Sequence, residues 1–150
     1  MREGDILLSV ALITKNEEDR LPKTLEAVKD LADEIVVVDS GSTDRTAEVA
    51  RSFGAKVFTE EWKGYARQRQ SALKKCRGKW ILFLDADEVL SEELKGEIRR
   101  VLKNPTAEGY LIKRKTVYLG KVLNHIWDND WVLRLVKRDA NPRWVGRVHE

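Results

Sequence analysis

The chain has 150 residues, a length that fits one domain with a single hydrophobic core. Charged residues make up 35% of it but the net charge is only +3, so overall charge does not indicate a nucleic-acid partner. No apolar run approaches the roughly 20 residues that cross a bilayer, the first residues do not resemble a secretory signal, and a lone cysteine cannot form an internal disulfide. We expect a cytoplasmic protein that contacts the inner face of the cell membrane at most peripherally.

Strand-like and helical patterns alternate from the start of the chain to about residue 103. The strand-like runs are 7–13, 34–39, 54–58 and 80–85, and the helical segments are 18–31, 45–53, 65–76 and 91–102. This order predicts an α/β fold, with a Rossmann-like, mainly parallel sheet and helices on both faces. The rest of the chain is rich in tryptophan and basic residues, with strand-like runs at 110–117 and 131–136. We interpret 104–150 as a β-containing extension of the same domain that covers a cleft.

The most informative segment is the apolar run 80–84, which ends in Asp85 and Asp87. Side chains alternate along a strand, so residues two apart point to one side and these carboxylates can converge at the carboxyl edge of the sheet. Open α/β sheets bind ligands at that edge, and two carboxylates repel each other unless a cation lies between them. Mg²⁺ or Mn²⁺ would fit this position. The alternative is that Asp85 caps a turn or the next helix while Asp87 is solvated.

Two other predicted strands end in polar residues that would reach the same edge. These are the segments Thr14-Lys15-Asn16-Glu17 and Asp39-Ser40-Gly41. Because the carboxyl ends of parallel strands meet at one edge of a sheet, a cleft there would have carboxylate and hydroxyl groups in its walls.

With these segments in order, the sequence resembles the family-two inverting nucleotide-sugar glycosyltransferases, which have the GT-A fold. The matching segments are the opening strand and loop Ser9–Glu18, the second strand with its Asp-x-Gly-Ser-x-Asp turn at Glu34–Asp44, the segment Gly64–Ala72 with Arg69, and the Asp-x-Asp motif in Phe83–Asp87. Gln70 departs from the pattern, because the family usually has asparagine after the arginine. The later segment Trp127–Glu150 is similar to a subgroup that transfers glucose or heptose during lipopolysaccharide core assembly.

The resemblance implies a nucleotide diphosphate sugar donor, most often a uridine nucleotide, and Mg²⁺ or Mn²⁺ as cofactor. It also implies a saccharide or lipid-linked acceptor of the cell envelope. Within the single domain 1–150, residues 1–103 would bind the donor and 104–150 would form the acceptor side. By the family pattern, the residues of the nucleotide-sugar site would be Thr14, Asn16, Glu17, Asp39, Arg69 and Asp85, and those at the metal Asp87 and Asp85.

The chemistry of two of these residues supports such roles independently. Ionised Asp39 can accept a hydrogen bond from the imide N–H of uracil and disfavours a base that presents an acceptor there. A divalent ion held by Asp87 would neutralise charge on the diphosphate as the sugar leaves. The alternatives are structural: Asp39 could cap the approach to the next helix, Thr14 could be an ordinary strand-end residue, and Arg69 could be a solvated charge on its helix.

Inversion at the sugar carbon requires a base that takes the proton of the acceptor hydroxyl on the face opposite the leaving group. His149-Glu150 matches a His-Glu pair of the resembling subgroup, so Glu150 is the first candidate, followed by Asp130 and Asp128. The alternative is that His149 is structural and Glu150 is only a charged last residue. Because members of the subgroup continue beyond this pair, we expect a truncated or unusually short chain, whose site a homodimer or another partner could complete.

Three other functions fit part of the pattern. A nucleotidyltransferase also uses paired carboxylates and a metal, but it predicts a glycine-rich phosphate loop after the first strand, which Thr14-Lys15-Asn16-Glu17-Glu18 is not. A nucleic-acid-binding module would use the basic last third and leave the acidic strand ends unexplained. The third is a nucleotide-sugar-binding module that lacks transfer activity because the chain is short. We expect glycosyl transfer, with no nucleic-acid partner.

Overall fold

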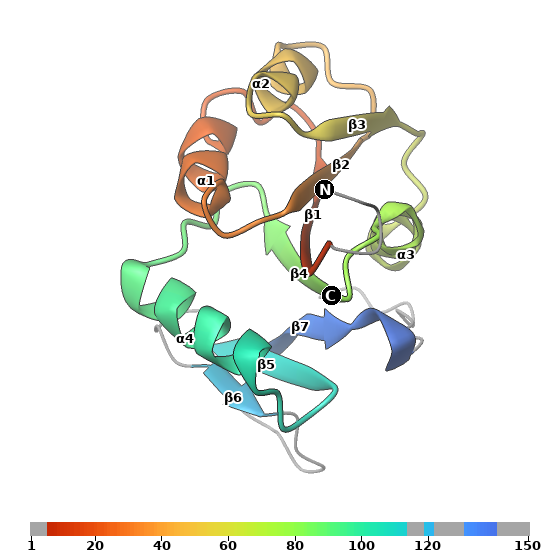
Figure 1. Ribbon diagram of the computed structural model, residues 1–150. Coiled ribbons are helices and arrows are strands. Elements are labelled where there is room, and N and C mark those ends of the chain that lie inside the picture. The colour runs from red at the N-terminus through yellow and green to blue at the C-terminus, as the bar shows by residue number, and fades with distance from the viewer. Residues whose placement is uncertain (1–5, 114–118, 122–130, 141–150) are drawn as a thin grey trace.

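The computed structural model describes residues 6–113, 119–121 and 131–140 (Figure 1). Within these residues the chain forms one seven-stranded sheet in the order β3-β2-β1-β4-β7-β5-β6. The strands are β1 (Leu8–Thr14), β2 (Glu34–Asp39), β3 (Lys56–Thr59), β4 (Trp80–Asp85), β5 (Gly109–Lys113), β6 (Leu119–Lys121) and β7 (Trp131–Lys137). A short 3₁₀ turn, Arg138–Ala140, follows β7.

The first four strands are parallel, and the remaining three extend the sheet beside β4. β1 pairs in parallel with both β2 and β4, and β2 pairs in parallel with β3. β7 runs antiparallel to β4, and β5 lies between β7 and β6, antiparallel to both. The described part of the β-containing extension therefore continues the sheet laterally. The prediction that the extension covers a cleft also involves residues 114–118, 122–130 and 141–150, which lie outside the described residues.

Helices cover both faces of the sheet, which confirms the α/β prediction. The helices are α1 (Leu21–Val28), α2 (Thr46–Ser52), α3 (Tyr65–Lys75) and α4 (Glu92–Lys103). One core cluster joins α1, α2 and α4 to alternate residues of the strands, and a second joins α3 to the residues between them. In Figure 1, α3 accordingly lies on the opposite side of the strands from α1. None of the helices in the described ranges combines the length and apolarity needed to span a membrane.

Helix boundaries follow local capping chemistry. Ser91 precedes α4, and its hydroxyl accepts a hydrogen bond from the Leu94 N–H at 3.1 Å, as an N-cap serine does. Helix α1 begins at Leu21, three residues later than the sequence pattern predicts. Pro22 lies in its first turn, where the missing N–H of proline costs nothing because that donor has no partner inside a helix.

A buried network closes the sheet at its amino edge. The Glu34 carboxylate accepts hydrogen bonds from the Ser9 hydroxyl at 2.6 Å, the Lys56 amine at 3.0 Å and the Arg77 N–H at 2.8 Å. The Ser9 hydroxyl in turn accepts from the Gly78 N–H at 2.9 Å. Burial raises the pKa of Glu34, but these hydrogen bonds outweigh it and lower the pKa to about 2. This network therefore stabilises the fold at the amino ends of the strands.

Candidate functional site at the carboxyl edge of the sheet

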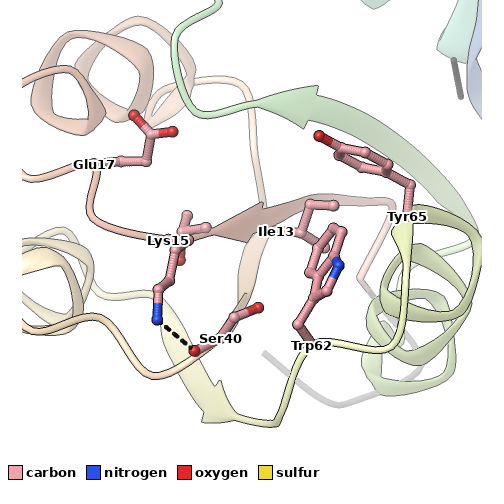
Figure 2. Close-up of a pocket in the computed structure, with 7 residues that line it drawn as sticks. Ile13, Lys15, Glu17, Ser40, Trp62 and Tyr65 are labelled. Carbon is pink, nitrogen blue, oxygen red and sulfur yellow. Dashed lines mark hydrogen bonds between the residues drawn. The ribbon is translucent and has the colours of Figure 1, made fainter. Parts of the chain in front are cut away.

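The ends of β1, β2 and β4 meet at one edge, as the strand order predicts. Thr14 is in register with Asp39 on one side, and Ile13 is in register with Asp85 on the other. A cavity of about 630 Å³ opens at this edge (Figure 2). Its lining residues are Ile13, Thr14, Lys15, Glu17, Ser40, Trp62 and Tyr65. The cavity therefore combines the end of β1 and the loops after β1 and β2 with Trp62 and the first residue of α3.

Two aromatic side chains form one wall of the cavity, and the sequence analysis did not select them. Trp62 is 50% exposed and Tyr65 is 47% exposed, and their rings meet edge to face with centroids 4.9 Å apart. Large apolar side chains exposed beside a cavity often mark a binding surface. The sequence signal was one aromatic residue in the short polar segment between β3 and α3, and another at the first residue of α3.

A basic group lies within the same cavity. The Lys15 amine donates hydrogen bonds to the carbonyls of Ser40 and Gly41, each at 3.1 Å, and Figure 2 shows the first of these. The amine therefore carries a positive charge to the cavity wall, on the same side of the molecule as the loop after β2. Lys15 and Ser40 were also absent from the predicted site, although both belong to polar strand ends that the sequence analysis placed at this edge.

Asp39 is buried at the end of β2, where it organises the loop that follows. Its carboxylate accepts hydrogen bonds from the hydroxyls of Thr14 at 2.7 Å and Ser42 at 2.6 Å, and from the backbone N–H groups of Gly41 and Ser42 at 3.1 and 2.8 Å. A carboxylate has about four acceptor positions, so protein donors account for this capacity. The structural alternative for Asp39, that it caps the loop, is what these contacts describe, and its contact with a nucleobase stays a prediction.

Asn16 and Glu17 connect the loop after β1 to the loop after β2. Asn16 adopts a positive φ of 53°, a conformation that asparagine tolerates better than most residues. Its N–H donates to the Ser42 hydroxyl at 2.8 Å, and its side-chain oxygen accepts from the Thr43 N–H at 2.8 Å. The Glu17 N–H donates to the Thr46 hydroxyl at 2.8 Å. Both predicted residues thus shape the cavity rim, and Glu17 also lines it.

Asp85, the last residue of β4, lies between two arginines from different elements. The Arg69 guanidinium on α3 is 3.1 Å from one carboxylate oxygen, and the Arg134 guanidinium on β7 is 3.6 Å from the other. Arg69 also lies over the Tyr65 ring, 5.4 Å from its centroid, a cation–π arrangement that links it to the aromatic wall. The structure therefore brings Arg69 and Asp85 together, as the predicted nucleotide-sugar site requires.

Asp87 lies beyond the end of β4 and has a different partner. Its carboxylate is 3.5 Å from the Arg20 guanidinium, which is also 2.6 Å from Glu17. Because the strand ends at Asp85, strand alternation does not set the direction of Asp87. Its side chain is 51% exposed, so this carboxylate is accessible to a cation from solution.

The residues at this edge fit a divalent cation that is shared with a substrate. Within the described ranges, no group of three or more histidine, cysteine, aspartate or glutamate side chains is arranged to hold a metal ion. Mg²⁺ typically needs only one or two protein carboxylates when substrate phosphates supply further oxygens. Asp87 provides one exposed carboxylate of the right chemistry, and Asp85 is adjacent but paired with arginines.

The predicted catalytic bases belong to the last part of the chain. Glu150 and Asp130, together with Asp128 and His149, lie outside the described residues. Their assignment as acceptor-side groups stays a prediction.

Comparison with known proteins identifies the family. The model for "Glycosyl transferase family 2" matches residues 9–144, well over half of the chain. An uncharacterized glycosyltransferase of Rickettsia bellii is 45% identical over 104 residues, which are 69% of this chain and 35% of that protein. The lipopolysaccharide core biosynthesis glycosyltransferase LpsC of Rhizobium meliloti is 37% identical over 119 residues, 75% of this chain and 44% of that protein. The chain thus spans less than half the length of these relatives.

Solved structures show the same fold. TarS of S. aureus superposes with a TM-score of 0.63 at 28% identity, covering 79% of this chain and 23% of TarS. Glucosyl-3-phosphoglycerate synthase of Mycobacterium tuberculosis, solved with Mn²⁺, uridine diphosphate and phosphoglyceric acid, has a TM-score of 0.60 at 24% identity, covering 74% of this chain and 43% of that one. The second likeness shows the fold alone. Sheet order, the position of the cavity and the family match agree: this chain has the GT-A fold and belongs to glycosyl transferase family 2.

Proposed function

We propose that this domain binds a nucleotide diphosphate sugar, linked to uridine, and forms the donor site of a metal-dependent inverting glycosyltransferase. The acceptor we propose is a lipid-linked or cell-envelope saccharide, reached at the inner face of the membrane. The observation that carries the proposal is the cavity of about 630 Å³ at the carboxyl edge, whose aromatic wall is followed by Arg69 over the Tyr65 ring and by Asp85 paired with Arg69. The relative named for lipopolysaccharide core biosynthesis supports the acceptor class.

The arrangement of groups along the edge supports one orientation of the donor. The aromatic residues Trp62 and Tyr65 line the cavity near the ends of β1 and β2, and an aromatic ring stacks well on a nucleobase. Arg69 and Asp87 lie toward the end of β4, where a diphosphate and its cation would be matched in charge. The base would therefore occupy the cavity and the diphosphate would extend toward β4.

Asp39 provides the argument for uridine. To accept a hydrogen bond from the imide N–H of uracil, its carboxylate would exchange one of its present donors, such as the Ser42 hydroxyl at 2.6 Å. An ionised acceptor at this point disfavours a base that presents its own acceptor there. The Thr14 hydroxyl, which donates to the same carboxylate oxygen at 2.7 Å, and the two backbone N–H groups on the other oxygen would hold the carboxylate in place during that exchange.

The proposed reaction forms one bond and breaks another at the anomeric carbon. The acceptor hydroxyl oxygen attacks that carbon, the bond from carbon to the diphosphate oxygen breaks, and its electron pair leaves with the nucleotide. The hydroxyl proton passes to a carboxylate on the opposite face, for which Glu150 and Asp130 are the candidates. A divalent cation at Asp87 would neutralise the charge that develops on the diphosphate. Arg69 would hold the diphosphate by charge-assisted hydrogen bonds. The family match favours this chemistry over nucleotidyl transfer.

Ligand-induced stabilisation tests the proposal directly. A uridine diphosphate sugar with Mn²⁺ should raise the melting temperature, since ligand at a hundred times its Kd adds about 2.7 kcal/mol of stability. Asp87→Asn should abolish the metal-dependent part of the shift. Glu26→Gln is the matched control, because Glu26 is a similarly exposed carboxylate on α1 that, within the described part of the chain, forms an ion pair only with Lys29. An unchanged melting curve at millimolar nucleotide sugar would overturn the proposal.

A further inference from the structure

Arg134 on β7 is a charged residue in an apolar strand, and it is only 6% exposed. Its guanidinium pairs with the Glu88 carboxylate through both terminal nitrogens, one of them 3.0 Å from the second carboxylate oxygen. It also donates to the Phe83 carbonyl at 3.2 Å. A buried charge is costly unless it is paired and hydrogen-bonded. These contacts therefore hold the side chain in one position.

The backbone of β7 is irregular at this residue. Tyr110 of β5 pairs with Leu135, and the next residue, Leu111, pairs with Leu133, so Arg134 is the extra residue of a β-bulge. Bulges change the direction of a side chain and occur frequently beside active sites. The bulge and the buried guanidinium are independent observations that concern the same residue.

Glu88 connects Arg134 to the turn of residues 85–88, which contains Asp87. The Glu88 carboxylate accepts a hydrogen bond from the Asp85 N–H at 2.8 Å, while the Glu88 N–H donates to the Asp85 carbonyl at 3.0 Å. This reciprocal pair closes the turn from Asp85 to Glu88 and fixes the backbone that carries Asp87. A change at Arg134 would release the Glu88 carboxylate and loosen the turn.

We infer that Arg134 is a positioning residue for the cation and diphosphate end of the donor site, acting through Glu88 on Asp87. The inference rests on the proposed function and goes beyond it, because it couples the extension containing β7 to donor binding. Arginine is required because its planar fork serves both oxygens of Glu88 and a carbonyl together. Lysine at this position would keep the charge and lose the fork.

Calorimetric titration of the full chain separates this role from simple stabilisation. The quantity to measure is the ratio of the UDP Kd without Mn²⁺ to the UDP Kd with Mn²⁺. Arg134→Lys should lower this ratio roughly tenfold or more, the usual effect of losing a residue that orients a metal ligand. The Kd of UMP without metal should stay within about twofold, since the cavity for the base is intact. Arg138→Lys is the matched control and should leave the ratio unchanged, because Arg138 donates to the Gly78 carbonyl at the opposite end of β4.

A second variant tests the same role in case Arg134→Lys destabilises the fold. Arg134→Gln combined with Glu88→Gln removes the buried guanidinium together with its carboxylate partner, while Asp85 keeps its pair with Arg69. This double variant should lower the ratio as Arg134→Lys does. If both variants keep the wild-type ratio, or if UMP and UDP affinities fall equally, the inference is overturned while the proposed function stands. If wild-type protein binds UDP with no dependence on Mn²⁺, both are overturned.

Discussion

The Arg69 guanidinium lies 3.1 Å from the Asp85 carboxylate, joining helix α3 to the last residue of strand β4. Arg69 is buried, and its planar group is also held over the Tyr65 ring. The side chain is therefore oriented before any ligand arrives, which lowers the entropy lost when it binds an anion.

Arg69→Gln should weaken UDP binding by about 10- to 150-fold, because a hydrogen bond to a charged group contributes about 1.5–3 kcal/mol. UMP should be less affected, since Arg69 is proposed to contact the diphosphate. Isothermal titration with the two nucleotides measures both effects. Arg67→Gln, an exposed arginine on the same helix, should bind UDP as wild type does. Equal UDP binding by the two variants would remove Arg69 from the donor site.

Trp62→Ala should weaken UMP binding by about 1–3 kcal/mol, the usual contribution of one stacked base. Trp62→Phe should retain most of the affinity, because a smaller ring still presents an aromatic face. Titration of UMP in the absence of metal isolates this contact from the diphosphate. Leu7→Ala removes another exposed apolar side chain, at the amino edge of the sheet, and should change nothing. Loss of affinity in Trp62→Phe equal to that in Trp62→Ala would contradict stacking.

Glu34 should make stability dependent on pH at the acid end. Its pKa is lowered from 4.5 to about 2 in the folded protein, so its contribution is complete above about pH 5 and disappears as the pH falls toward 2. The shift corresponds to roughly 3 kcal/mol. Urea unfolding between pH 7 and pH 3 measures the loss of unfolding free energy. Glu34→Gln should make this free energy depend less on pH over the same range. Parallel pH profiles for the two proteins would rule out this role for Glu34.

Gly78→Ala should destabilise the fold by about 1–3 kcal/mol through overpacking. A Cβ atom there would lie 2.7 Å from both the Ser9 N–H nitrogen and the Ser9 hydroxyl oxygen. Gly96→Ala is the counterpart, because a Cβ on this exposed position of α4 meets nothing within 4 Å. Alanine is favoured over glycine inside a helix by about 1 kcal/mol, so Gly96→Ala should stabilise. Chemical denaturation compares the two, and changes of the same sign would contradict the packing argument.

The helix and strand order of the first 103 residues was predictable from local patterns. The strand Glu34–Asp39 and the N-cap Ser91 are where the sequence places them, because alternation and capping involve neighbours in the chain. The start of α1 was predicted too early, since the periodic spacing of leucines does not show that the turn before Pro22 is non-helical. The prediction that Thr14, Asp39 and Asp85 reach one edge is confirmed by strand register.

The cavity wall was harder to predict. Trp62 lies in a segment with no strong periodicity and Tyr65 begins α3, and the sequence does not distinguish an aromatic residue at such a position from one that packs into the core until its exposure is known. Most tryptophans lie in the last third of the chain. The cavity instead uses Trp62, which precedes α3, and Tyr65, the first residue of α3.

By itself, the sequence determined the α/β architecture and the edge at which its carboxylates gather, because periodicity, capping and crossover handedness are encoded within short segments. Only the tertiary structure decided what each carboxylate contacts. Asp39 is bonded within its own loop, whereas Asp85 is held by Arg69 and Glu88 is held by Arg134, which is 46 residues away in the chain. Such pairs depend on how distant elements pack and on a bulge in β7, and no local pattern specifies them.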